Sequence, residues 1–317
     1  MMFDDEIAAS VGYLGSAEAL ACLEASSYWP KWDSPWWHML LLHEMGETRR
    51  IPERTMRAFV DAMKATPFTI FMDGPGELPK GADPYFTACH CQLGNVYRVL
   101  DGFGVDVDAE LPWVGPWFVA NQMADGGMNC DESAYAVTDE CPSSMVGTIA
   151  AFEAMALKSA EGLSEEAASF LDRAAGFMVG RRLTMGSETR HNAAEREAAA
   201  SWMLPCFPRF YHYDVIRGLT ALSLWAERRG VSVPREAIGP VVEAVDRAFP
   251  DGVVRIGRRC WEGVGTIMQT GDGSWDYRRR EAPGFPLLEA VSAVGAASPY
   301  LTREWAGTRR RMLGVLG

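Results

Sequence analysis

Two kinds of apolar pattern alternate along the chain. In the first kind, apolar residues recur three and four positions apart with charged residues between them, as they do within residues 56–63. This spacing predicts an amphipathic helix that buries one face. The same stripe recurs within 167–178 and 238–245, where Pro240 is expected to kink or delay the helix.

The second kind of segment is apolar on nearly every face. It covers residues 36–42, 85–100, 143–157, 213–226 and 285–297. A helix that is apolar all round has no face suited to water, so each of these segments is predicted to form a buried helix.

The order of the segments predicts the architecture. The buried segments begin near Pro35, Pro84, Pro142, Tyr211 and Pro286. Their amphipathic partners begin near Pro52, Asp108, Ser164, Pro234 and Thr302. The buried starts recur at roughly 50–70 residues, which is long enough for one helix pair and a loop. The pattern therefore predicts an all-α fold made of repeated helical hairpins.

We expect these hairpins to close into an α/α toroid of five to six helical hairpins, in which buried helices form an inner ring around an apolar central cavity. Residues 1–30 would form an N-terminal helical segment that closes the ring, and residues 31–317 would form the hairpin repeats of a single domain. An open solenoid is the alternative, but it needs polar capping repeats that are not evident in the sequence. One short strand is expected at 253–256, opposite 275–277.

Composition narrows the class of protein. The formal net charge of −12 argues against a nucleic-acid partner, which would require a basic surface. No apolar run approaches the ~20 residues of a transmembrane segment, and the acidic N-terminus is unlike a signal peptide. We therefore expect a cytoplasmic protein with reduced thiols, since its seven cysteines are odd in number and scattered. The sequence leaves homo-oligomerisation open.

Two glutamine-containing loops carry a recognisable pattern. Residues 118–128 and 269–275 fit an aromatic-x3-Gln-x3-Gly-x-Trp spacing, with Met128 in place of Trp in the first and no aromatic before Gln269 in the second. We expect the glutamine to satisfy free backbone groups and the glycine to permit a tight turn. The pattern resembles the QW repeat of squalene–hopene cyclases, and protein prenyltransferase β subunits carry related repeats. Residues 125–132 and 207–219 also resemble squalene-cyclase-like bacterial proteins of unassigned activity.

This resemblance implies a terpenoid cyclase-like toroid. Its implied function is to bind an apolar, isoprenoid-like small molecule in the cavity and to catalyse an acid-initiated cyclisation or isomerisation. The Asp-x-Asp-Asp acid motif of triterpene cyclases is absent, and the nearest string, residues 106–110, precedes an outer helix. Two alternatives therefore stay open: a zinc-dependent, prenyltransferase-like transferase or lyase, and a non-catalytic binding module on the same fold.

Candidate catalytic residues open the fourth buried helix. In a toroid the N-terminal ends of the inner helices surround one mouth of the cavity, so functional groups are expected there. Asp214 would act as the general acid if an apolar setting raised its pKa, with His212 and Tyr211 beside it. The structural alternatives are a helix N-cap for Asp214 and a hydrogen-bonded core histidine for His212.

Aromatic and polar residues near the same mouth are candidate substrate-binding groups, because aromatic faces stabilise cations. They are Trp36, Trp37, His38, Tyr85, His90, Trp275 and Asp276. Core packing for the aromatic residues, and a turn for Asp276, are the structural alternatives.

Zinc is the only cofactor that the sequence suggests. Cys130, Asp131 and His212 would supply a mixed ligand set, although no tight Cys-x2-Cys pair supports it. Residues 89–91 read Cys-His-Cys on a predicted helix, and successive helical residues point about 100° apart, so we reject these three as a self-contained site. No glycine-rich phosphate loop or aspartate-rich motif indicates magnesium-dependent diphosphate ionisation.

Overall fold

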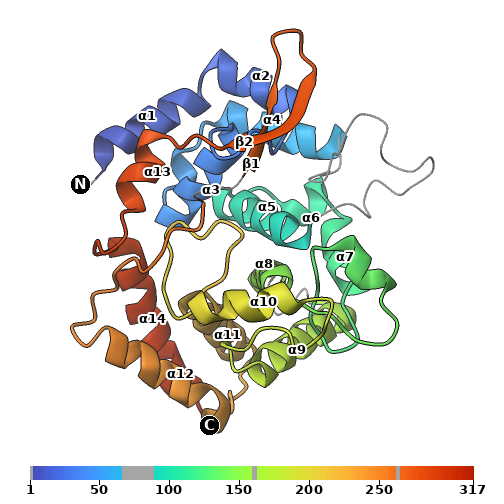
Figure 1. Cartoon of the computed structure of the whole chain (residues 1–317), viewed down its shortest axis with the longest axis vertical. Coiled ribbons are helices and arrows are strands. Elements are labelled where there is room, and N and C mark those ends of the chain that lie inside the picture. The colour runs from blue at the N-terminus through green and yellow to red at the C-terminus, as the bar shows by residue number, and fades with distance from the viewer. Residues whose placement is uncertain (1–2, 66–88, 159–162, 262–264) are drawn as a thin grey trace.

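The computed structural model describes residues 3–65, 89–158, 163–261 and 265–317. Within these ranges the chain is mainly helical, as predicted, with one small sheet (Figure 1). The longer α-helices are α1 (Asp4–Leu14), α2 (Ala17–Ala25), α3 (Pro35–Met45), α4 (Glu53–Ala65), α5 (His90–Phe103), α8 (Met145–Leu157), α9 (Glu165–Gly180), α11 (Val215–Arg229), α12 (Arg235–Ala248) and α14 (Pro299–Val315). The shorter ones are α6 (Val107–Glu110), α7 (Val114–Ala120), α10 (Ala193–Ala198) and α13 (Pro286–Val291), and 3-10 turns cover Thr48–Arg50, Glu132–Ala136 and Ala199–Ser201.

Local chemistry sets the ends of the central helices. Ser144 precedes α8 and its side chain accepts a hydrogen bond from the Gly147 backbone N–H, which satisfies a donor that the first helical turn leaves free. Ser298 does the same for α14. Helices α3 and α5 end at Gly46 and Gly104, with φ of +83° and +96°, a conformation that favours glycine.

Helices α3, α5, α8, α11 and α14 pack in sequence against one another. The closest approach joins α5 to α8, where a Cβ on Gly94 would lie only 2.3 Å from the backbone of Ala150. Figure 1 shows α8 near the middle of the molecule, with α9 and α12 towards its edge. Four of these five helices lie on segments predicted to be buried.

Each of these five helices contributes a charged side chain to one buried cluster, which we call the charged centre: Glu44, Arg98, Glu153, Arg217 and Glu304. Glu153 Oε2 accepts from Arg217 Nη2 at 2.6 Å and from Arg98 Nη1 at 3.0 Å. A charge removed from water needs a partner. Glu304 pairs with Arg209 Nη1 at 2.7 Å, and Glu44 accepts hydrogen bonds from the backbone N–H groups of Arg209 and Phe210. The place where the helices meet is therefore charged, whereas the sequence led us to expect an apolar cavity.

The last predicted hairpin is wrong in detail. The segment 285–297 was expected to form one buried helix, but α13 ends at Val291 and the chain then turns. The amphipathic helix expected from near Thr302 is present as α14, which begins at Pro299, but it packs against α11 and supplies Glu304 to the charged centre instead of lying wholly outside it.

The predicted strand pairing is also corrected. Strand β2 (Trp275–Glu281) pairs antiparallel with β1 (Gly265–Gln269), not with 253–256. Residues 253–256 make only an isolated bridge, between Arg255 and Ala297.

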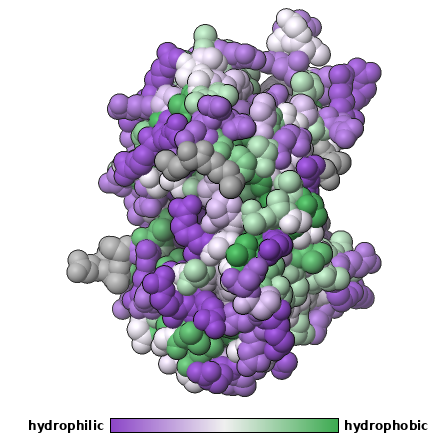
Figure 2. All heavy atoms as spheres, turned by 90° about the vertical axis from the view of Figure 1, so that its left-hand side faces the viewer, coloured by the Kyte–Doolittle hydropathy of each residue, from purple (hydrophilic) through white to green (hydrophobic). Residues whose placement is uncertain are grey.

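The surface is largely hydrophilic on the face that Figure 2 shows. Hydrophilic residues cover much of the face in Figure 2, with hydrophobic residues scattered among them. In the described ranges, none of the helices has the length and hydropathy that a transmembrane span requires.

Candidate metal centre

Three cysteines from two segments lie together at the N-terminal end of α5. The Sγ atoms of Cys89, Cys91 and Cys130 all lie within 4.8 Å of one another, and within the described ranges theirs is the one such group of potential metal ligands. Cys89 and Cys91 are buried, and Cys130 is half-buried. We call these three residues the metal centre.

The start of α5 explains why Cys89 and Cys91 converge. Cys89 is the N-cap residue, with extended φ and ψ of −78° and 116°, so it lies outside the helix. The 100° rotation between helical residues therefore does not separate the two sulfurs, which are 2.8 Å apart. Rejecting residues 89–91 as a self-contained site was right for His90, but it overlooked that the two cysteines could share a site with a third from elsewhere.

Backbone donors at the helix start stabilise negative sulfur. The Cys91 N–H donates to Cys130 Sγ at 3.4 Å. Hydrogen bonds from the thiols of Cys130 and Cys91, helped by the Gln92 backbone N–H, hold the pKa of the Cys89 thiol well below its usual range. The pKa values of Cys91 and Cys130 are raised, because hydrogen bonding between the sulfurs and burial both oppose a second thiolate. A divalent cation would remove that opposition.

The donor set fits zinc. Zinc prefers thiolates at about 2.3 Å, which places tetrahedral sulfur ligands about 3.8 Å apart. The separation of 2.8 Å between Cys89 Sγ and Cys91 Sγ would therefore have to widen by about 1 Å. Three protein ligands leave one tetrahedral position for another ligand, as in catalytic zinc sites.

A lysine enclosed by aromatic rings lies beside the metal centre. Lys31 is 8% exposed, and its Nζ donates to Tyr211 Oη at 3.1 Å. The Lys31 Nζ lies 4.9–5.5 Å from the ring centroids of Tyr28, Trp29, Trp32 and Tyr211. Burial lowers the pKa of Lys31 to about 8, and the nearby Cys91 and Cys89 sulfurs act in the opposite direction.

The hairpin of β1 and β2 helps to hold this lysine in place. Thr266 Oγ1 accepts a hydrogen bond from the Lys31 backbone N–H at 2.7 Å. Arg279 lies over the ring of Trp29, 5.0 Å from its centroid. The hairpin therefore orders the segment that carries Lys31.

Several buried polar atoms near these residues lack a hydrogen-bond partner among the described residues. They include both side-chain polar atoms of Gln92, which follows Cys91, and Nε2 of His212, which follows Tyr211. Buried polar groups are normally satisfied by protein, water or a ligand. These atoms lie next to Cys91 and Tyr211 in the sequence.

His90 does not join the metal centre. Its Nδ1 accepts from Trp117 Nε1 at 3.0 Å, and its Nε2 lies 2.8 Å from Tyr135 Oη. Because the indole can only donate, Nδ1 is the acceptor and Nε2 carries the proton. Burial lowers the pKa of His90 to about 4. The expectation that His90 faces a substrate cavity is replaced by a neutral core histidine with both nitrogens occupied.

The predicted zinc ligands Cys130, Asp131 and His212 do not come together. Asp131 is half-exposed and pairs with His191 at 2.8 Å. His212 stacks on Tyr211, and burial lowers its pKa to about 3. Only Cys130 of the predicted set belongs to the metal centre, because the loop after it turns the Asp131 side chain outward towards His191.

Asp214 has the structural role that was its alternative interpretation. It is fully buried and caps α11, accepting from the Arg217 backbone N–H at 2.9 Å. Arg209 Nε donates to its Oδ2, also at 2.9 Å. Burial opposes the charge, but Arg209 and the backbone donors hold the pKa of Asp214 below its ordinary value. An ionised, paired carboxylate is not a proton donor, so the predicted general acid is corrected.

Trp36, Trp37 and His38, which were predicted to bind substrate, are buried in the hydrophobic core. Trp36 stacks on Phe59 of α4 at 5.1 Å between ring centroids, and His38 stacks on Phe285 at 3.6 Å. Trp37 is fully buried and packs edge-on against Trp32 at 4.4 Å. Of these three residues, only Trp37 contacts the rings around Lys31, because it packs against Trp32 and Tyr28.

The remaining candidates lie elsewhere. Trp275 and Asp276 are in β2, where Asp276 pairs with Arg278 and Arg280 on the exposed hairpin. These pairs occupy the carboxylate that was expected to bind substrate. Tyr85 lies outside the described residues.

The structural role expected for the two glutamines is confirmed. Gln122 Nε2 donates to the backbone O of Gly126 and of Phe170, both at 2.8 Å. Gln269 Nε2 donates to Gly273 O at 2.9 Å. In each loop the glutamine closes a turn onto a glycine four residues later, where the glycine has positive φ.

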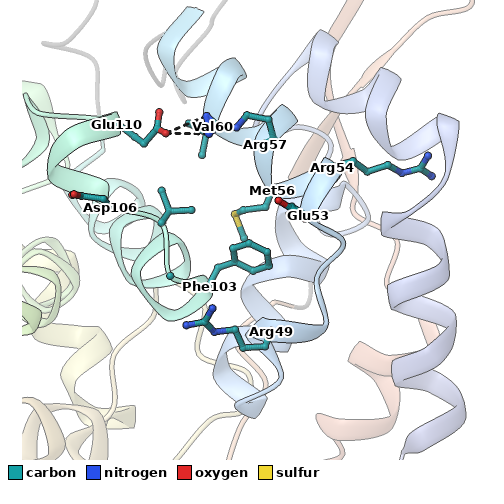
Figure 3. A pocket seen from close by; sticks show the side chains of 11 residues that line it. Arg49, Glu53, Arg54, Met56, Arg57, Val60, Phe103, Asp106 and Glu110 are labelled. Atoms are coloured by element: carbon teal, nitrogen blue, oxygen red, sulfur yellow. Dashed lines mark hydrogen bonds and ion pairs between the residues drawn. The ribbon is translucent and has the colours of Figure 1, made fainter.

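A surface groove of about 710 Å3 lies apart from the metal centre and from Lys31 (Figure 3). It runs between α4 and the end of α5, and Arg57 pairs with Glu110 across it at 3.1 Å. Its lining mixes arginines with carboxylates and includes none of the metal-centre residues.

Sequence reasoning missed Lys31 and Thr266 altogether. A lysine within Tyr-Trp-Pro-Lys-Trp, residues 28–32, was a usable signal, because so many aromatic neighbours rarely leave a lysine in open solvent. Thr266 carried no signal, since its contact with Lys31 spans 235 residues of sequence.

Comparisons with known proteins give no further guidance. No protein-family model matches the chain, and neither the curated proteins nor the solved structures gave a match. Any functional conclusion therefore depends on the geometry of the site.

Proposed function

We propose that this chain is a zinc-dependent transferase or lyase, built on an α/α toroid and acting on a small molecule with an apolar part. Cys89, Cys91 and Cys130 would hold the ion at the start of α5. The proposal is carried by one observation, the convergence of these three sulfurs within 4.8 Å. When bound, a zinc ion would act as a Lewis acid or lower the pKa of a ligand at the open position.

The residues around the metal centre would bind the substrate and balance charge. Three thiolates and a divalent ion carry one net negative charge, which the ammonium of Lys31 would offset. The rings of Tyr28, Trp29 and Trp32 surround Lys31 and would offer apolar surface to the substrate. Tyr211 Oη, hydrogen-bonded to Lys31, would hold a proton beside the substrate.

Acid-initiated cyclisation by a terpenoid cyclase-like enzyme is the weaker proposal. It needs a protonated carboxyl group in an apolar setting, and Asp214 is paired with Arg209. In the metal centre the pKa of Cys89 is already low, and a bound divalent cation would itself favour deprotonation of Cys91 and Cys130.

Metal analysis of purified protein tests the proposal. After dialysis, we expect one zinc per chain, and less than about a tenth of that in Cys130→Ser, because two thiolates hold zinc far less tightly than three. Cys141→Ser is the matched control, since Cys141 lies in the same loop and outside the metal centre. Equal zinc in the two variants would refute the site.

A second measurement separates a catalytic centre from a structural one. Cobalt(II) in the centre would report its fourth ligand through its visible spectrum. We expect added 2-mercaptoethanol to change that spectrum, because an open position accepts an external thiolate. An unchanged spectrum would mean that the protein closes the site itself, and the enzymatic proposal would fail while metal binding stood.

A further inference from the structure

A second cavity of about 320 Å3 lies beside the second half of α5. It is open to solvent and is lined by the C-terminal end of α3, by parts of α5, α11 and α14, and by Phe207 and Arg209 from the segment before α11. Arg98 lines it, seven residues beyond Cys91, which is about 10 Å along a helix. We call it the arginine cavity. Its volume is at the lower end of the range for sites that bind small molecules.

The arginine cavity has a small excess of positive charge. Five arginines line it: Arg98, Arg209, Arg217, Arg303 and Arg311. The carboxylates that line it or pair with these arginines number four: Glu44, Glu153, Asp214 and Glu304. His43 also lines the cavity, and burial lowers its pKa to about 3, so it adds no charge. One positive charge is left over at neutral pH.

That excess is located at the edge formed by α14. Arg303 lies over the ring of Tyr300, 5.9 Å from its centroid, and Arg311 donates to Ser223 and Thr308, each at 3.1 Å. Among the described residues neither guanidinium has a carboxylate within ion-pair distance. Both are available to an anion from outside.

A buried donor in the same cavity is also unsatisfied. Arg209 is 7% exposed, with Nε bound to Asp214 and Nη1 bound to Glu304. Its Nη2 has no hydrogen-bond partner among the described residues. A buried guanidinium N–H without an acceptor is costly, so an oxygen atom from a ligand would stabilise this arrangement.

We propose that the arginine cavity binds a small molecule that carries one carboxylate. The carboxylate would accept hydrogen bonds from Arg303 and Arg311 at the edge of the cavity and from Arg209 within it, and these planar donors match its geometry. Phe207 and Tyr300 stack on one another at 4.9 Å and line the same cavity, which suits an apolar or aromatic body. Glu44 and Glu304 also line it and disfavour a dianion such as a phosphate monoester.

Calorimetric titration with matched probes tests this site. We expect benzoate to bind the wild-type protein and the neutral isostere benzamide not to bind. Phenyl phosphate should bind more weakly than benzoate. Butyrate and 2-naphthoate extend the series to other sizes, and failure of all three monocarboxylates to bind would overturn the proposal. Equal binding of benzamide, or tighter binding of phenyl phosphate, would overturn the charge argument on which it depends.

Variants at the edge of the cavity locate the binding. Arg303→Gln combined with Arg311→Gln should weaken benzoate binding by about tenfold or more, since charged hydrogen bonds are lost. Arg309→Gln combined with Arg310→Gln is the control, because it removes the same two charges from the same helix outside the cavity. Equal weakening by the control would mean that overall charge is responsible, and would refute the site. Cys130→Ser should retain benzoate binding, so this site and the metal centre can fail independently.

Discussion

The backbone N–H of Cys91 donates to Sγ of Cys130 at 3.4 Å, across 39 residues of sequence. This contact joins the first turn of α5 to the loop before α8. A helix N-terminus favours negative charge, so it stabilises a thiolate from another segment as well as one of its own. The metal centre is thus a product of tertiary packing at the start of a helix.

Lys31 is predicted to tune metal affinity. Replacing it in Lys31→Gln removes the ammonium near the Cys89 and Cys91 sulfurs, and should lower zinc affinity about tenfold. Competition with a chromogenic chelator would measure this. Lys158→Gln, at the far end of α8, serves as the control because Lys158 pairs with Asp108. Identical zinc affinities in wild type and Lys31→Gln would show that the lysine does not interact with the metal.

Asp214→Asn should unfold more easily, whatever its activity. The change removes a buried ion pair with Arg209 and weakens the cap of α11. We expect a loss of about 3–5 kcal/mol in the free energy of unfolding. Asp172→Asn, which breaks the half-exposed pair with Arg229, should lose less than about 1 kcal/mol. Urea denaturation compares them, and a fully stable Asp214→Asn that had lost only an activity would restore the acid role.

Acid sensitivity should begin near pH 6.5. Burial lowers the pKa values of His43, His90 and His212 to about 3, 4 and 3, from the ordinary 6.5. Below pH 6.5 the unfolded chain binds protons at these sites while the folded chain does not, so acidification favours unfolding. Each histidine should cost about 1.4 kcal/mol per pH unit until its folded pKa is reached.

Urea denaturation between pH 6.5 and 5 measures this slope. His90→Gln should reduce the slope by about 1.4 kcal/mol per pH unit, because glutamine does not take up a proton when the chain unfolds. A slope that is the same in wild type and His90→Gln would contradict the assignment of His90 as a buried neutral residue.

Gly94→Ala should destabilise the contact between α5 and α8. Its new Cβ would lie 2.3 Å from the backbone of Ala150, which cannot move without separating the helices. We expect a loss of about 1–3 kcal/mol. Gly176→Ala in α9 meets no atom within 4 Å and should gain about 0.5–1 kcal/mol from helix propensity. Thermal unfolding of both variants gives the comparison, and a stabilised Gly94→Ala would show that the helices are further apart.

The apolar pattern located most central helices because burial of a face is a local property of sequence. It also predicted α14 close to its observed start, but as an outer helix, and that placement was wrong for a physical reason. The rule assumes that the polar face of an amphipathic helix meets water, but Glu304 of α14 meets the charged centre instead. Glu153 and Arg217 were visible as charges within apolar segments, and an interior charge requires a partner. Treating them as partners would have predicted a charged interior.

The candidate site was harder to predict than the helices. Cys89 and Cys91 were noticed, but the first residue of α5 decides whether their sulfurs converge, and sequence leaves helix starts uncertain by one or two residues. Cys130 was grouped with Asp131 as a zinc ligand because the two are adjacent in sequence. In the structure, Cys130 contacts Cys91, which lies 39 residues earlier. The residues around Cys130 in the sequence do not indicate that it contacts Cys91.

Zinc K-edge X-ray absorption on the purified protein tests the central claim most directly. The proposed centre predicts three sulfur neighbours at about 2.3 Å and one lighter oxygen or nitrogen neighbour at about 2.0–2.1 Å. A spectrum with only oxygen and nitrogen neighbours, or an unchanged sulfur shell in Cys89→Ser, would contradict it.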